Sequence, residues 1–126
     1  MLTDTIADFA TRLRNASLVN KETITLKNTK LIKTIADVMV SEHYLESASV
    51  EDGNLTVKLV YVATKPAINS IKRISKPGMR IYKKGHELSK VLSGLGIGIV
   101  STSRGVMSNT SAVKQNLGGE VLLELW

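Results

Sequence analysis

The chain has 126 residues, of which 43% are hydrophobic and only 4% aromatic, and its formal net charge is +6. This hydrophobic fraction is sufficient for a packed core and excludes a disordered chain. The absence of cysteine excludes a disulfide scaffold, a thiolate metal site and a cysteine nucleophile, and the longest apolar runs are far shorter than the roughly 20 residues that cross a membrane.

The positive charge is confined to one half of the sequence. Residues 1–62 hold seven Lys/Arg and eight Asp/Glu, whereas residues 63–126 hold ten Lys/Arg and three acids. Between 65 and 90, Glu87 is the only acid among eight basic residues. A one-sided basic field attracts a polyanion, although a solvated, solubilising face has the same composition.

The first half predicts two helices on a small sheet. Asp4 is a suitable helix cap, and strands are expected at 22–26, 45–50 and 55–62. The last two strands are joined by an Asp-Gly pair typical of tight hairpins. Asn28 or Thr29 is expected to cap the second helix. The apolar stripes of the two helices are Ile6, Phe9, Ala10 and Leu13, and Leu31, Ile32, Ile35, Val38 and Met39.

The second half is richer in glycine, with eight of the nine glycines after residue 77. Residues 63–66 are expected to form a linker, and Ser108 or Asn109 to cap a short helix. Strands are predicted at 68–74, 79–82, 96–102 and 120–126, with a helical turn at 86–92. The predicted fold is α+β, with two small α/β subdomains at 1–62 and 63–126, the second richer in strand and glycine turns.

Two patterns that can indicate catalysis lack the context that catalysis needs. The run GLGIG at 94–98 is similar to a nucleotide-binding loop, but a helical turn precedes it and strand residues follow, the reverse of the required order. These glycines are expected instead to allow close packing and a strand bend. The segment 111–114 matches an acyl-enzyme pattern without its companion motifs. With no acid–base pair either, the sequence predicts no enzyme, no cofactor and no metal site.

Three consecutive hydroxyl residues stand at the end of a predicted strand, followed by a cation and a glycine. They are Ser101, Thr102 and Ser103, before Arg104 and Gly105. Hydroxyls donate and accept hydrogen bonds, and therefore suit the base edges and 2′-hydroxyls of an RNA minor groove. The alternative is a turn whose hydroxyls satisfy its own backbone.

An aromatic residue lies within the basic segment. Tyr82 is flanked by Arg80, Lys83 and Lys84. A tyrosine in such a setting can stack on a nucleotide, and the alternative is a core tyrosine at a strand edge.

Four segments resemble the family of the eighth small-subunit ribosomal protein. They are the opening, with LTD at 2–4, IAD at 6–8 and TRLRN at 11–15, then RISKPGMRIY at 73–82, GLGIGIVSTSRGVM at 94–107, and GGEVL at 118–122. Together they span the chain in order. Three places depart from the family pattern. Residues 108–113 replace a stretch that is usually charged, and Thr5 and Glu124 also differ from the residues usual at their positions.

The resemblance implies a non-enzymatic constituent of the small ribosomal subunit that binds the central domain of its ribosomal RNA and supports early assembly. The implied partners are this RNA and neighbouring ribosomal proteins, with no membrane and no small-molecule substrate. The implied location is the ribosome of a bacterial cytoplasm or of an organelle such as a plastid. Family members can also bind messenger RNA that mimics the ribosomal site.

By position, the resemblance implies RNA contacts in three places: the hydroxyl turn with the nearby basic segment, the second glycine turn, and the first helix. The implied residues are Ser101, Thr102, Ser103, Arg104, Tyr82, Lys83, Arg80, Gly118, Glu120, Arg12, Arg14 and Asn15. A small enzyme that uses the glycine run for a nucleotide and a non-ribosomal RNA regulator are the competing hypotheses.

Overall fold

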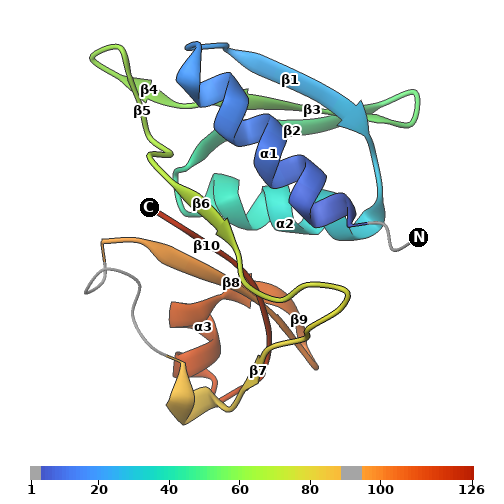
Figure 1. Ribbon diagram of the computed structural model, residues 1–126, viewed down its shortest axis with the longest axis vertical. Helices are drawn as coiled ribbons and strands as arrows, with labels where there is room; N and C mark the ends of the chain where they lie inside the picture. The colour runs from blue at the N-terminus through green and yellow to red at the C-terminus, as the bar shows by residue number, and fades with distance from the viewer. Residues whose placement is uncertain (1–3, 89–94) are drawn as a thin grey trace.

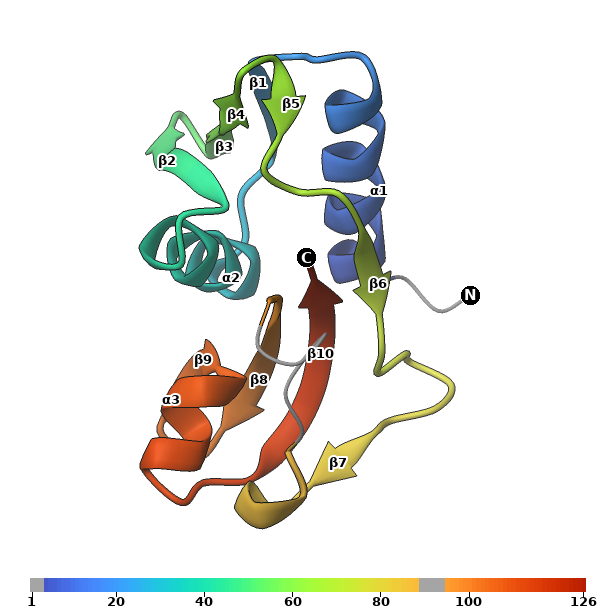
Figure 2. The ribbon, with the colours of Figure 1, turned by 90° about the vertical axis from the view of Figure 1, so that its left-hand side faces the viewer.

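The computed structural model describes residues 4–88 and 95–126. Two helices and a three-stranded sheet of the first half lie at one end, and a five-stranded sheet with a short helix lies at the other (Figures 1 and 2). The predicted α+β class is confirmed. Among the described residues, no helix is long and apolar enough to cross a membrane.

Both long helices begin at side-chain caps. In α1 (Thr5–Leu18), a carboxylate oxygen of Asp4 accepts a hydrogen bond from the Ala7 amide at 3.1 Å, and in α2 (Lys30–Ser41) the Thr29 hydroxyl accepts from the Ile32 amide at 3.2 Å. These bonds satisfy amide groups that have no partner within the helix. The predicted α2 stripe is wrong at Leu31, which is exposed; the buried positions are Ile32, Ile35, Ala36 and Met39.

The first sheet is antiparallel, in the order β1-β3-β2. Its strands are β1 (Thr23–Lys27), β2 (Leu45–Glu51) and β3 (Asn54–Leu59). Buried residues alternate with exposed ones along β1, and the buried face packs on the helices. Asp52 and Gly53 both have positive φ, at 51° and 78°, which confirms the predicted tight turn between β2 and β3.

The predicted linker at 63–66 is wrong, because these residues belong to a small hairpin. Strand β4 (Tyr61–Val62) pairs with β5 (Lys65–Pro66), and the predicted strand at 55–62 is therefore divided after Leu59. The turn residues Ala63 and Thr64 have φ of 51° and 67°. Positive φ at both positions is usually supplied by Asn, Asp or Gly, so this turn has no sequence signal.

The second sheet has the order β6-β10-β8-β9, with β7 pairing beside the start of β10. Its strands are β6 (Ile71–Arg73), β7 (Tyr82–Lys83), β8 (Ile97–Thr102), β9 (Gly105–Ser108) and β10 (Gly119–Leu125). The 3₁₀ turn η1 (Gly85–Glu87) follows β7, and α3 (Asn109–Lys114), capped by Ser108, follows β9.

Three predictions for the second half need correction. The strand expected at 68–74 is limited to Ile71–Arg73. Of the strand expected at 79–82, only Tyr82 belongs to a strand, β7, and Met79 forms an isolated bridge with Lys76 through two backbone hydrogen bonds of 2.9 Å that close the turn at 77–78. The helical turn expected at 86–92 is a 3₁₀ turn one residue earlier, and 89–92 lie outside the described residues.

One hydrophobic core joins the two sheets. Strand β10 changes register between Val121 and Leu123, and this irregularity lets three consecutive residues, 121–123, all be buried. Leu122 and Leu123 pack in the same cluster as Phe9 of α1 and residues of α2 and the first sheet.

Candidate nucleic-acid interface

Strand pairing brings the predicted contact residues to one end of the second sheet. Tyr82 of β7 is opposite Glu120 of β10, and Glu120 is opposite Ser101 of β8. Directly opposite residues in antiparallel strands point to the same face. Three segments far apart in sequence therefore place these three side chains in one row.

The three hydroxyls of the turn at 101–103 differ in whether they form hydrogen bonds within the protein. The Thr102 hydroxyl donates to the Gly105 carbonyl at 2.8 Å and accepts from the Arg104 amide at 3.1 Å. Within the described part of the chain, the hydroxyls of Ser101 and Ser103 have no hydrogen-bond partner. Ser103 and Arg104 form the exposed tip of the β8–β9 hairpin. The interpretation as a turn that satisfies its own backbone therefore holds for Thr102, whereas contact of Ser101 and Ser103 with RNA stays a prediction.

Tyr82 is not a core residue, since it is 69% exposed. Its exposed ring borders an open groove of about 510 Å³, whose walls come from the basic segment and the second glycine turn. Its charged lining residues are two lysines, Lys83 and Lys84, and one acid, Glu87, and the lining also includes His86 and Asn116. A cationic groove beside an exposed aromatic ring has the chemistry that binds a nucleotide chain.

Glu120 is engaged within the protein. Its carboxylate accepts a hydrogen bond from the buried Ser75 hydroxyl and pairs with Arg80, with Nη1 and Oε2 3.0 Å apart. The Ser75 hydroxyl also accepts from the Ile81 amide at 3.2 Å. Only 16% of the Glu120 side chain is exposed. Glu120 therefore fixes the segment that leads into Tyr82, and it partly neutralises Arg80.

The second glycine turn needs both of its glycines. A Cβ atom on Gly118 would lie 2.5 Å from the Lys83 carbonyl oxygen, and one on Gly119 would overlap the Ser101 carbonyl oxygen. The predicted close packing at 94–98 is not found at Gly98, where a Cβ would stand 3.5 Å from that of Asn109, an ordinary contact. Gly94 lies outside the described residues.

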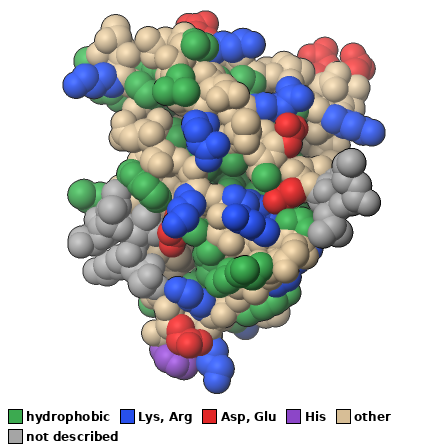
Figure 3. Space-filling model, viewed as in Figure 1, with side chains coloured by type: hydrophobic (Ala, Val, Ile, Leu, Met, Phe, Trp, Pro, Cys, Tyr) green, Lys and Arg blue, Asp and Glu red, His purple; other side chains and the backbone are tan. Residues whose placement is uncertain are grey.

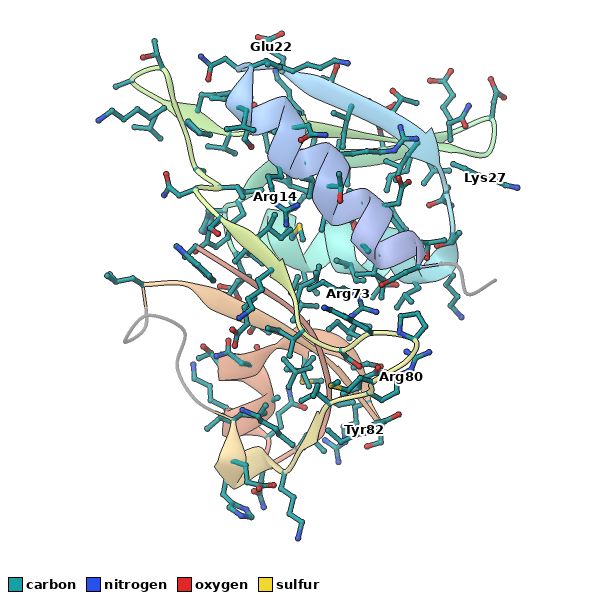
Figure 4. All side chains as sticks on the ribbon, in the orientation of Figure 1. Arg14, Glu22, Lys27, Arg73, Arg80 and Tyr82 are labelled. Atoms are coloured by element: carbon teal, nitrogen blue, oxygen red, sulfur yellow. The ribbon has the colours of Figure 1, made fainter. Side chains whose placement is uncertain are left out.

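The contacts implied for the first helix lie apart from this row. Arg12 pairs with Asp8 at 3.1 Å and, with Asn15, borders a second open groove of about 310 Å³ between α1 and β1. Arg14 Nη2 donates to the Ile71 carbonyl of β6 at 2.5 Å. Figure 4 shows Arg14 near the junction of α1 and β6, well above Tyr82.

Arg73 belongs to the core and not to the basic surface. Its Nε lies 3.0 Å from a carboxylate oxygen of Asp4, its Nη1 donates to the Leu122 carbonyl at 2.8 Å, and only 9% of the side chain is exposed. The charge count between 65 and 90 thus overstates the available charge, because Arg73 and Arg80 are both paired. The described lysines of this segment are Lys65, Lys72, Lys76, Lys83 and Lys84.

Two tyrosines of the first half, Tyr44 and Tyr61, have raised pKa values. Desolvation, and to a lesser extent the Glu42 carboxylate, raises the pKa of Tyr44, and desolvation with Glu22 raises that of Tyr61. The Tyr61 hydroxyl donates to the Lys21 carbonyl at 2.6 Å, a structural role. No group of acidic or histidine side chains among the described residues is arranged to hold a metal ion.

Comparison with known proteins decides the family. The profile of the family described as ribosomal protein S8 matches residues 4–126. The chain belongs to the ribosomal protein S8 family. Small ribosomal subunit protein uS8 of Nitratidesulfovibrio vulgaris strain DP4 is 45% identical over 126 residues, and that of Desulfovibrio desulfuricans is 42% identical; both comparisons cover all of each chain. The predicted family is confirmed, and with it the prediction of a structural, non-enzymatic ribosomal protein.

Proposed function

We propose that this protein is a structural constituent of the small ribosomal subunit and binds the central domain of its ribosomal RNA through the Tyr82–Glu120–Ser101 row and the adjoining hairpin tip. The observation that supports this is the strand register, which aligns an exposed aromatic ring, unpaired hydroxyls and a lysine-lined groove at one end of the sheet. Hydroxyls and an aromatic ring read RNA shape and bases, and lysines hold its phosphates.

The rest of the surface supports a division of labour. Residues 63–126 carry a net charge of +7 and the row, so we assign them the principal contact, whereas 1–62 carry −1 and serve mainly as scaffold. Figure 3 shows Lys and Arg side chains over both halves of this face, with Asp and Glu side chains among them, so the assignment rests on the net charges and on the row. The groove beside Arg12 and Asn15 is positioned for a second, smaller RNA contact.

Three finer proposals follow from the family. Direct binding to RNA suits a role early in subunit assembly, before other proteins cover the site. The relatives compared above are bacterial, which favours a bacterial ribosome over an organellar one. Because the surface would recognise RNA by shape, a messenger RNA with the same fold would bind to it as well.

The direct test is a footprint of the full-length protein on total RNA. We expect protection of one stem in the central domain of small-subunit ribosomal RNA. Protection spread evenly over all RNA would indicate non-specific electrostatic binding, and protection outside ribosomal RNA alone would favour a non-ribosomal regulator.

Ser103 and Thr102 are expected to respond differently to loss of their hydroxyls. Ser103→Ala should weaken binding to the protected stem by about 1–3 kcal/mol, the size of a good base-edge contact. Its melting temperature should be unchanged, because the Ser103 hydroxyl has no partner among residues 4–88 and 95–126. Thr102→Val should lower stability by about 1 kcal/mol, because it removes hydrogen bonds within the turn.

Titration calorimetry and thermal melts measure both quantities. Thr110→Ala, which removes an exposed hydroxyl from α3, is the control and should change neither. Equal affinity of Ser103→Ala and the unaltered chain would exclude Ser103 from the RNA contact.

Binding should weaken steeply as salt rises, because lysines that contact phosphates release condensed counterions. Replacing Lys83 with Gln should reduce the slope of log affinity against log salt by about 1 without changing which stem is bound. The matched control is Lys65→Gln, on β5 at the opposite end of the molecule (Figure 1). A slope that falls equally in both variants would show a diffuse charge effect and not a contact at the groove.

A further inference from the structure

The edge strands of the two sheets differ in how they are protected from pairing with a strand of another chain. An open edge presents unpaired backbone N–H and C=O groups to another chain, and proteins usually cover it or place lysine or proline on it. In the second sheet, β6 contacts α1 and β9 contacts α2; in the first sheet β2 also contacts α2, but Leu45 is the only buried residue of that strand. In the first sheet, β1 carries Lys27 and follows Lys21, whereas β2 contains no lysine, arginine or proline.

Strand β2 is long and accessible. It has seven residues, of which only Leu45 is buried, and even Val50 near its end is 44% exposed. A bulge lies between Leu45 and Ser47, and from Ser47 to Glu51 the pairing with β3 is regular. Small residues occupy the middle of this stretch, so side chains do not obstruct a strand that approaches the edge. Alternate residues direct their backbone groups away from β3.

The charge around β2 is opposite to that of the rest of the protein. Residues 34–57 include five acids and neither lysine nor arginine. Two of the acids are paired, Asp37 with Lys33 at 2.6 Å and Glu46 with Lys58 at 3.6 Å. Across the described residues, Glu42, Glu51 and Asp52 form no ion pair. This edge repels RNA phosphates and attracts cations.

We propose that the outer edge of β2 binds an extended segment rich in lysine and arginine from a neighbouring ribosomal protein, which adds to the first sheet as a fourth strand. Backbone hydrogen bonds provide the affinity in this binding mode, and the acids on β2 select the cationic segment. The inference rests on the proposed function, because that function places the chain among such neighbours.

A second copy of this chain fits the edge poorly. In an antiparallel pair of two β2 strands, Glu51 of one copy approaches Glu46 of the other, and the strand has no cation to offset them. Like charges in opposed positions destabilise a pair of strands.

The test uses the full-length protein assembled into small subunits, with a photocrosslinking amino acid in place of Ser49 on β2. We expect a crosslink to a protein, within a peptide rich in lysine and arginine. A separate variant, with the photocrosslinking amino acid at position 103 instead, should crosslink to ribosomal RNA. If position 49 crosslinks to RNA, to a second copy or to nothing while the chain is in the subunit, the inference is overturned and the proposed function stands. A chain that does not enter subunits contradicts both.

Charge reversal provides the matched control. Glu51→Lys should lower the yield of the crosslink from position 49 by about two- to fivefold, the range expected for one exposed charge pair. Glu22→Lys, the same change at the residue before β1, should leave the yield unchanged. An equal loss in both variants would show that the attraction is not local to the β2 edge, which overturns the proposal.

Discussion

Asp4→Ala is expected to lower the free energy of unfolding by about 3–5 kcal/mol, the usual cost of removing one partner from a buried ion pair. Its carboxylate, 20% exposed, pairs with a guanidinium that is 9% exposed, so Arg73 would be left nearly buried without its partner. The same carboxylate caps α1, which adds about 1 kcal/mol. Urea unfolding at constant m-value measures the loss.

Two comparisons divide this effect between its causes. Asp4→Asn keeps a good helix cap and removes the charge, so the difference between the Ala and Asn variants reports the cap. Asp8→Ala breaks only the exposed pair with Arg12 and should cost less than about 1 kcal/mol. If Asp4→Ala costs no more than Asp8→Ala, the Asp4–Arg73 pair does not stabilise the fold.

The Asp4–Arg73 pair connects the start of α1 to the second sheet. Arg73 also holds the Leu122 carbonyl at the irregularity of β10, and Arg14 holds the Ile71 carbonyl of β6. α1 is therefore connected to the second sheet by two arginines as well as by the shared core. The two halves thus share polar contacts in addition to the common core.

Local chemistry explains which elements could be predicted. The caps at Asp4, Thr29 and Ser108 and the Asp-Gly turn are signals within a few residues, and all are confirmed. The β4–β5 hairpin could not be predicted, because neither Ala63 nor a β-branched threonine is a usual residue for positive φ.

The candidate site was only partly predictable for a different reason. Its residue types are visible in the sequence, but their arrangement depends on long-range strand pairing, such as that of Glu120 with Tyr82 and with Ser101. Glu120 meets Ser75 and Arg80, and Arg73 meets Asp4, through tertiary structure alone. The count of basic residues between 65 and 90 therefore includes Arg73, although its side chain is only 9% exposed.

Gly119→Ala is expected to cost about 3 kcal/mol of stability, at the upper end of the usual range for overpacking. The added methyl group would overlap the Ser101 carbonyl oxygen, and it would lie 3.1 Å from the Thr102 Cα. Both neighbours are backbone atoms held in the sheet, so β10 and β8 would have to separate. Gly78→Ala is the matched control, because a Cβ there meets nothing within 4 Å.

The same change should weaken RNA binding beyond its effect on stability. Separation of β10 from β8 would displace Glu120 from its place between Tyr82 and Ser101, and so break the row on which the proposed contact depends. At a temperature where both variants are fully folded, we expect Gly119→Ala to bind the protected stem at least about tenfold more weakly than Gly78→Ala, a difference of about 1.4 kcal/mol. Equal affinity would mean that RNA recognition does not require the alignment of these strands, because the strands would have moved while binding was retained.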